Sequence, residues 1–273
     1  GVTNVAHADA LLFWLSFWMY LASFALFSIF AAVRGRGVGV VASTAFIAAF
    51  VCHTGALAAR WIITTHPPFA TMHEYAVTMS WAVAVSFIVI MARFRRAVLG
   101  VAVSPLIIVV LAIASLLPKE ASKQLMPALQ SYWFYIHVTL AALAEGAFIV
   151  AAGAGIVYLS RRKRTERTEP IPEEDLIEEI IARAIRIGYP IFTIGAMFAG
   201  AIWAQYAWGS FWSWDPKETG SLVIWLYYTL VLHQNVRGRW RGKALAVSAI
   251  VGFALALLSF LGNLFLGGLH SYI

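Results

Sequence analysis

The feature that most restricts the fold of this chain is a succession of apolar stretches, each long enough or nearly long enough to cross a lipid bilayer. A helix needs about 20 residues to span a hydrocarbon core of about 30 Å. The stretches cover approximately residues 10–33, 38–62, 75–91, 97–117, 132–159, 187–206, 222–236 and 245–266. Hydrophobic residues make up 61% of the chain and charged residues 12%, which is more apolar surface than a soluble core can bury. The sequence therefore predicts an all-α protein, a polytopic bundle of about eight transmembrane helices.

The basic residues indicate how this bundle is oriented. Of the 20 Lys and Arg residues, all but Arg60, Lys119, Lys123 and Lys217 lie in segments that alternating spans place on one side of the membrane. Basic loops stay in the cytoplasm by the positive-inside rule. We therefore expect both termini and the segment around residues 208–219 on the extracytoplasmic side. The net charge of +7 reflects the basic loops and does not indicate nucleic-acid binding.

One polar insert, about residues 160–186, separates the fifth and sixth stretches. Its first part is basic, and residues 170–175 (PIPEED) then open a helix with an acidic first turn. Apolar residues follow at helical spacing, namely Leu176, Ile177, Ile180, Ile181, Ala184 and Ile185. This pattern predicts an amphipathic helix along the cytoplasmic face, with docking of a partner as the alternative. No internal repeat is visible, so we expect residues 1–273 to form a single transmembrane domain.

The segment of residues 203–220 (WAQYAWGSFWSWDPKETG) is unusually rich in aromatic residues, and we expect it to form an external loop. Tryptophan and tyrosine often anchor a protein at the membrane interface, which is the simpler interpretation. The density here also suits stacking on a large, planar, apolar ligand. The candidate binding residues are Trp208, Phe211, Trp212 and Trp214 for stacking, with Ser213, Asp215 and Lys217 at the polar edge.

Three histidines point to haem as that ligand. His137 near the start of the fifth stretch and His270 after the eighth flank the aromatic loop from the same side, and two imidazoles are a common axial pair for haem iron. His233 lies in the seventh stretch near its cytoplasmic end, where an ionisable residue is expected to be paired or functional. Cys52 is the only cysteine, so a CxxCH attachment site is excluded and haem would be held non-covalently.

Three further polar residues leave alternatives open. Glu145 lies eight residues after His137 on the same helix face, where it could support a ligand or carry a proton. Arg60 could bind a carboxylate of the ligand or form an ion pair with Glu74 or Asp215. For His53, within the second stretch, a hydrogen bond to a neighbouring helix is the simpler interpretation.

Residues 208–219 (WGSFWSWDPKET) resemble the tryptophan-rich "WWD" signature of haem-handling proteins in cytochrome c maturation, and the surrounding pattern is similar to the CcsA family, also called ResC, of the system II pathway. The likeness extends to residues 67–74 (PPFATMHE), 136–138 (IHV), 232–233 (LH) and 268–272 (GLHSY). Relatives of the CcmC type share the signature but usually have six membrane helices and lack a membrane histidine. Eight helices with His233 therefore favour the CcsA type.

The resemblance implies a path for haem b. Haem would enter from the cytoplasm at a membrane site using His233, then reach the outer site with His137 and His270 as axial ligands and the WWD loop as its platform. There its vinyl groups would meet the thiols of an apocytochrome c CxxCH motif and form thioethers. The family also implies a membrane partner of the CcsB (ResB) type and a bacterial or organellar energy-transducing membrane. The synthase activity would belong to the complex rather than to this chain alone.

Three other functions compete with this one. A CcmC-like protein would deliver haem without the membrane site. A membrane b-type cytochrome would hold its haem permanently, deep between helices. A proton-coupled transporter would use Glu145, His53 and His233 as a relay, but it often shows broken helices and an internal repeat.

Overall fold

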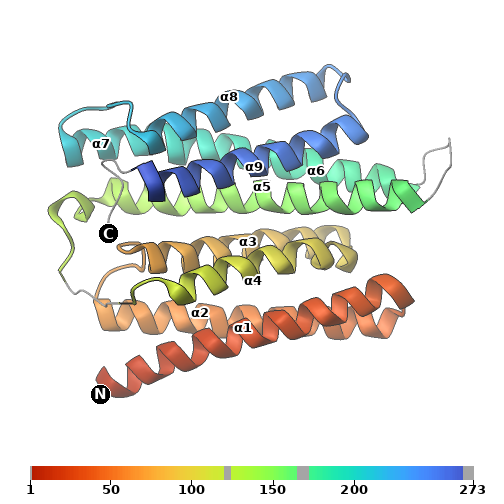
Figure 1. The fold of residues 1–273 in the computed structure, drawn as a ribbon, viewed down its shortest axis with the longest axis horizontal. Helices are drawn as coiled ribbons and strands as arrows, with labels where there is room; N and C mark the ends of the chain where they lie inside the picture. Colours follow the sequence, from red (N-terminus) through yellow and green to blue (C-terminus); the bar gives the residue numbers. More distant parts are fainter. Residues whose placement is uncertain (1, 120–123, 165–171, 267–273) are drawn as a thin grey trace. The chain divides into compact units, whose positions relative to one another are not determined.

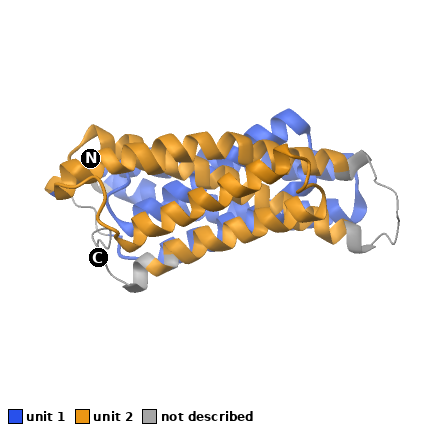
Figure 2. Cartoon of the chain, turned by 90° about the horizontal axis from the view of Figure 1, so that it is seen from above, with its two compact units in different colours: residues 1–126 blue, residues 127–273 orange. Residues whose placement is uncertain are grey.

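The computed structural model describes residues 2–119, 124–164 and 172–266, and within these ranges the ordered elements are all helical. The chain divides into two compact units, residues 1–126 and 127–273 (Figure 2). Two compact units can belong to one domain, so the single domain stays a prediction. We describe each unit by itself.

Unit 1 is built from four long helices in consecutive antiparallel pairs (Figure 1). The helices are α1 (Val2–Val33), α2 (Arg36–Thr64), α3 (Met72–Phe94) and α4 (Gly100–Leu116), and a short 3₁₀ helix, η1 (Ala97–Leu99), precedes α4. α1 packs on α2 and α4, while α3 packs on α4. Buried aromatic rings fill the core between them, as where Phe46 and Phe87 lie 4.9 Å apart in an edge-to-face contact.

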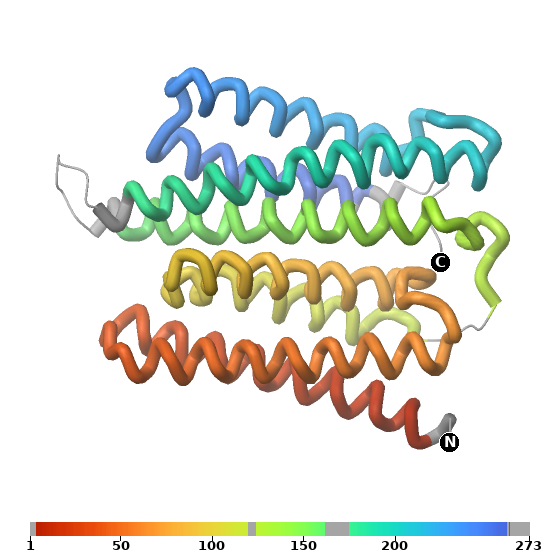
Figure 3. Tube along the Cα trace, turned by 180° about the vertical axis from the view of Figure 1, so that it is seen from behind, coloured from red at the N-terminus to blue at the C-terminus, as the bar shows by residue number. Residues whose placement is uncertain are grey.

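Unit 2 is organised around α5 (Tyr132–Arg164), against which most of its other helices pack (Figures 1 and 3). The others are η2 (Pro127–Leu129), α6 (Pro172–Phe192), the π-helix η3 (Thr193–Ala199), α7 (Gly200–Trp208), α8 (Pro216–Val236) and α9 (Lys243–Leu266). Small residues on α5 permit close approach of its neighbours. At Gly155, for example, an added Cβ would lie only 2.7 Å from the carbonyl oxygen of Ala246 in α9.

The predicted polytopic helical bundle is confirmed. Seven of the described helical segments are long and apolar enough to cross a membrane. The remaining predicted span, residues 222–236, corresponds to α8, which falls outside that group. The apolar part of α8 is short. The helix begins with the polar residues Lys217 and Glu218 and ends near the polar residues Gln234 and Asn235. An α-helix satisfies its own backbone hydrogen bonds, so it can cross the lipid core, where no water is present to pair with N–H and C=O groups.

The amphipathic helix predicted in the polar insert is confirmed, although it begins a longer helix instead of forming a separate element, and its place at the cytoplasmic face stays a prediction. α6 continues without interruption through η3 and α7 to Trp208, so the insert and the sixth stretch form one long helix. The apolar face packs on α5 rather than on lipid headgroups, and Ile177, Ile180 and Ile181 are buried. Gly188 allows α6 to pack closely on α5, because an added Cβ would lie 2.8 Å from the ring of Phe148.

Candidate functional site

A recess in unit 2 brings the predicted His137 together with part of the aromatic loop. It is lined by residues of α5, η3, α7, the connection between α7 and α8, and the first turns of α8. The lining residues are His137, Ala196, Gly200, Ala201, Phe211, Trp212, Lys217, Glu218 and Ser221. The empty volume is about 350 Å³, part of it open to solvent. Binding sites for small molecules are typically concave, mostly apolar and equipped with a few polar groups, as here.

Two contacts hold His137 in place, one made by a ring nitrogen and one made by the face of the ring. Its Nδ1 lies 2.9 Å from the carbonyl oxygen of Gly195 in η3. Its ring is stacked on the indole of Trp203, at 5.6 Å between centroids and 10° between planes. Trp203 is 1% exposed, and its Nε1–H donates to the carbonyl oxygen of Ala128 at 2.7 Å. His137 therefore lines the recess in a fixed orientation.

The π-helix η3 and its glycines allow this contact. The N–H of Gly200 donates to the carbonyl oxygen of Gly195, the five-residue spacing of a π-helix. An added Cβ on Gly195 would clash with Leu140 of α5, and one on Gly200 would lie 2.9 Å from Nδ1 of His137. Sequence reasoning missed both glycines, although their spacing of five residues next to the aromatic segment was a visible signal.

The aromatic loop between α7 and α8 is tied to the start of α8 by Glu218. α7 ends at Trp208, and Gly209 then adopts a left-handed conformation with φ of 79°. Glu218 Oε2 accepts hydrogen bonds from Ser213 N at 2.7 Å, Ser213 Oγ at 3.1 Å and Asp215 N at 3.3 Å. Asp215 caps α8 in return, since its Oδ1 accepts from Lys217 N at 2.9 Å. Asp215 and Glu218 thus form a capping box, which the Asp-Pro-x-Glu pattern could have revealed.

The predicted stacking residues have different surroundings. Trp208 contacts Trp203 edge-on, at 5.7 Å and 70°. Trp212 lines the recess with Phe211 and contacts Trp214 at 5.8 Å and 90°. Phe211 is 58% exposed and Trp214 70% exposed, so the loop also presents aromatic surface outside the recess. The fourth tryptophan of the segment, Trp203, is a core residue that supports His137.

Two charged residues of α8 add polar groups to the recess. Lys217 lines it, and its Nζ lies 6.0 Å from the ring centroid of Phe260. Glu218 Oε1 is buried and has no hydrogen-bond partner among the described residues. A buried oxygen of this kind usually has a donor in the functional state. The recess therefore combines an imidazole, aromatic faces, an ammonium group and an acceptor.

The other two predicted haem ligands are not brought to this recess within the described structure. His270 lies outside the described residues, so its pairing with His137 stays a prediction. His233 is exposed in the last turns of α8. It follows Ser221 of the recess by about 18 Å along the helix axis, at roughly 1.5 Å per residue. Its predicted role at a separate membrane site stays a prediction.

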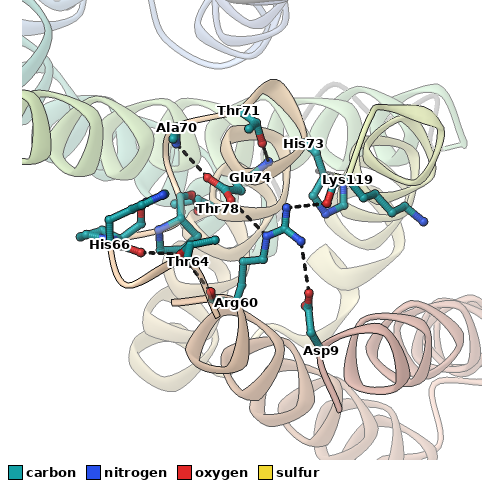
Figure 4. A network of polar contacts seen from close by, with 12 residues as sticks. Asp9, Arg60, Thr64, His66, Ala70, Thr71, His73, Glu74, Thr78 and Lys119 are labelled. Carbon is teal, nitrogen blue, oxygen red and sulfur yellow. Dashed lines mark hydrogen bonds and ion pairs between the residues drawn. The ribbon is translucent and has the colours of Figure 1, made fainter. Parts of the chain in front are cut away.

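A second polar cluster closes one end of unit 1 around the buried Arg60 (Figure 4). The Nε of Arg60 donates to Glu74 Oε1 at 3.0 Å, Nη1 to Asp9 Oδ2 at 3.4 Å and Nη2 to the carbonyl oxygen of Lys119 at 2.8 Å. The ion pair with Glu74 that the sequence offered as one alternative is confirmed. Asp9 was missed, because only the fold brings α1 to this position.

The same cluster fixes the connection between α2 and α3 that includes residues 67–74. Glu74 Oε2 accepts from Ala70 N at 2.9 Å, and Thr78 Oγ1 donates to the carbonyl oxygen of Pro68 at 3.0 Å. His73 Nδ1 donates to the carbonyl oxygen of Ala114 in α4 at 2.7 Å. These contacts explain the polar residues of this connection by structure alone.

His53 and Glu145 do not line the recess. His53 is completely buried, with Nε2 3.1 Å from the carbonyl oxygen of Val77 and Nδ1 3.3 Å from the hydroxyl of Tyr20. It joins α1, α2 and α3, which confirms the hydrogen-bond interpretation. Glu145 is half-buried on α5, further along the helix than His137.

Comparison with known proteins agrees with this picture. The family model described as "Cytochrome C assembly protein" matches residues 53–270. The cytochrome c biogenesis protein CcsA of Mesostigma viride is 32% identical, over 79% of this chain and 80% of that protein. CcsA of Prochlorococcus marinus (strain MIT 9301) is 31% identical, over 78% of each chain, and CcsA of Guillardia theta is 29% identical, over 98% of this chain and 94% of that protein.

The solved structure of the cytochrome c haem lyase CcmF shares the fold. It aligns with a TM-score of 0.73 at 17% sequence identity, covering 96% of this chain. This chain spans about half of the CcmF chain, since the alignment covers 49% of it. The family match and the CcsA relatives together decide the assignment. The chain belongs to the cytochrome c assembly protein family, in its CcsA group, and takes part in cytochrome c maturation.

Proposed function

We propose that this chain is the haem-binding subunit of a cytochrome c synthase, and that it presents haem at the recess for attachment to an apocytochrome CxxCH motif. The observation that carries this proposal is the position of His137, an oriented imidazole at an aromatic recess beneath the WWD loop. The CcsA relatives are named as cytochrome c biogenesis proteins and CcmF as a cytochrome c haem lyase, and these names support the proposal.

The residues of the recess fit the chemistry of haem as a substrate. Imidazole is a standard axial ligand for haem iron, and the faces of Trp212 and Phe211 suit a flat apolar macrocycle. Lys217 can oppose the negative charge of a propionate. The exposed Trp214 extends the aromatic surface beyond the recess. The recess is too small for a haem as it stands, because part of its empty volume of about 350 Å³ is open solvent, so the loop is expected to open around its substrate.

Haem, when bound, supplies the vinyl groups that react with the cysteine thiols. The contribution of this chain is to hold and orient its substrate so that the two reactants meet. His137 binds the iron from one face, and His270 is proposed as the ligand from the other. The aromatic loop keeps water from the apolar edge.

The proposal extends to the membrane and to the partners. Basic residues at the end of α5 and at the α8–α9 connection support a cytoplasmic position for that end of unit 2, and hence an extracytoplasmic WWD loop at the start of α8. His233, exposed near the far end of α8, is proposed as the ligand of an entry site. A membrane partner of the CcsB (ResB) type would contribute the other ligand there, and apocytochrome c would receive the haem.

The test compares optical spectra of the purified chain, with its presumed partner and with haem supplied. We expect a haem Soret band in the wild type that weakens or shifts in His137→Ala and in His270→Ala. The matched control is His7→Ala, since His7 is exposed near the start of α1 and outside the recess. In His233→Ala we expect less haem to reach the outer site than in the wild type. The absence of haem from every sample, or spectra of the two outer-site variants equal to the wild type, would contradict the proposal.

A further inference from the structure

A neutral histidine can bind a metal only through the ring nitrogen that carries no proton. The two nitrogens are distinct, and the hydrogen bond made by one of them decides which tautomer is present. At His137 this choice is made by a backbone group. Nδ1 lies 2.9 Å from the carbonyl oxygen of Gly195, and a carbonyl oxygen only accepts hydrogen bonds. Nδ1 must therefore carry the proton in this contact.

We propose that the π-helix η3 is a positioning device that locks His137 in its Nδ1–H tautomer, so that the lone pair of Nε2 is presented to the haem iron. This inference rests on the proposed function, because it names what orients the ligand of that site. Histidines that bind metals usually donate their other N–H to a carboxylate or a carbonyl, which also makes them more basic. Here Gly195 supplies that carbonyl.

The geometry of the π-helix makes the carbonyl of Gly195 available. In η3 this oxygen accepts the N–H of Gly200, and it is also the oxygen contacted by His137. A carbonyl oxygen has two lone pairs and can accept both bonds. Single π-turns inside α-helices occur frequently at functional sites. The π-turn therefore has a specific role. Its Gly195 carbonyl oxygen accepts both the N–H of Gly200 and the Nδ1–H of His137 from α5.

Two neighbouring residues hold the ring in place around this bond. Gly200 leaves room for it, because an added Cβ would lie 2.9 Å from Nδ1 and 3.0 Å from Cε1 of His137. Trp203 lies parallel to the ring, at 10°, and is itself fixed by its bond to Ala128. A ring flip would replace the Nδ1–H donor by a carbon at the carbonyl of Gly195 and leave the ring in the same plane. The stack therefore fixes the plane of the ring, and the bond to Gly195 selects its orientation within that plane.

The experiment measures the tautomer directly, by ¹⁵N NMR of the imidazole nitrogens in histidine-labelled protein without haem. The His137 signals are assigned as those missing from His137→Gln. We expect the Nδ1–H tautomer in the wild type. In Gly200→Ala the added methyl group pushes the ring from Gly195, and we expect loss of that tautomer. The control is Gly37→Ala on α2, where an added Cβ meets nothing within 4 Å.

Haem titration of the same samples shows whether the tautomer serves iron binding. We expect Gly200→Ala to weaken haem binding by roughly 10- to 100-fold, the usual effect of losing a group that orients a metal ligand. Gly37→Ala should bind as the wild type does. Trp203→Leu provides a second variant that removes the stack without adding a clash, and it should also mix the tautomers and weaken binding.

The outcomes separate this inference from the proposed function. An Nε2–H tautomer at His137 in the wild type would overturn the inference, even if His137→Ala abolishes haem binding. Unchanged haem affinity in a Gly200→Ala protein with an altered tautomer would also overturn it. If His137→Ala binds haem as the wild type does, the proposed function fails instead, whatever the tautomer.

Discussion

At the scale of single residues, Glu218 has the widest influence on the candidate site. One of its carboxylate oxygens accepts hydrogen bonds from Ser213 and Asp215, so it fixes the end of the loop that carries Phe211, Trp212 and Trp214. The other oxygen is buried at the recess. A residue with both roles links the conformation of the loop to the contents of the recess.

We predict that Glu218→Ala loosens the loop. Its loss leaves the buried N–H of Asp215 without its acceptor, at a cost of about 1–3 kcal/mol, whereas the N–H of the exposed Ser213 can turn to water. Hydrogen exchange should therefore speed up across residues 209–215. The control is Glu179→Ala, whose exposed ion pair with Arg183 at 2.6 Å should contribute less than about 1 kcal/mol. Equal exchange in wild type and Glu218→Ala would contradict this role.

Much of this site was foreseeable at the level of residue types. The aromatic density around Trp212, together with the family likeness, pointed to His137 as a ligand. The part played by Gly195 was not foreseeable, because it acts through a backbone carbonyl that any residue possesses. Trp203 was grouped with the other tryptophans, since a sequence does not show which indole is buried. The contacts of His270 stay a prediction.

At the scale of helices, polar side chains in buried positions join neighbouring elements. In unit 1 the guanidinium of Arg60 on α2 bridges Glu74 on α3 and Asp9 on α1 (Figure 4). His53 joins the same helices further along, through Val77 and Tyr20. Because association of helices in lipid has little hydrophobic driving force, such contacts and close packing hold the helices together.

We predict that Arg60→Met strongly destabilises unit 1. It leaves the buried carboxylate of Glu74 without its cation, and breaking a buried pair from one side typically costs about 3–5 kcal/mol. The measurement is thermal unfolding in detergent. Arg60→Met combined with Glu74→Gln should lose less than Arg60→Met alone, because the uncompensated charge is gone. A double variant less stable than the single variant would contradict this account.

Helix boundaries were less foreseeable than helix positions. The periodicity of residues 176–185 correctly indicated an amphipathic helix, yet the same pattern fits a helix on a membrane surface and one packed on a protein neighbour. The deciding contact is with α5, where Gly188 faces Phe148. That contact comes from elements about 40 residues apart in the sequence, and local periodicity does not report it.

At the scale of the whole molecule, hydropathy alone predicted the class of fold. Each span must satisfy its own backbone hydrogen bonds in lipid, so long apolar stretches become helices whatever their neighbours are. The distribution of basic residues gave a direction across the membrane as a further prediction. The division into residues 1–126 and 127–273 was not visible in the sequence, because it depends on which helices pack together.

The orientation can be tested with single cysteines in a Cys52→Ala background. Gln130, exposed just before α5, lies at the end of unit 2 where α5 begins, and Gly37 lies beside Arg36 at the basic end of α2. The positive-inside rule keeps the Gly37 end in the cytoplasm, so a maleimide that cannot cross membranes should label Gln130→Cys in intact cells. It should label Gly37→Cys only after the membrane is permeabilised, which also serves as the control for reactivity. The reverse pattern would place His137 and the WWD loop on the cytoplasmic side, where they could not present haem to an extracytoplasmic apocytochrome.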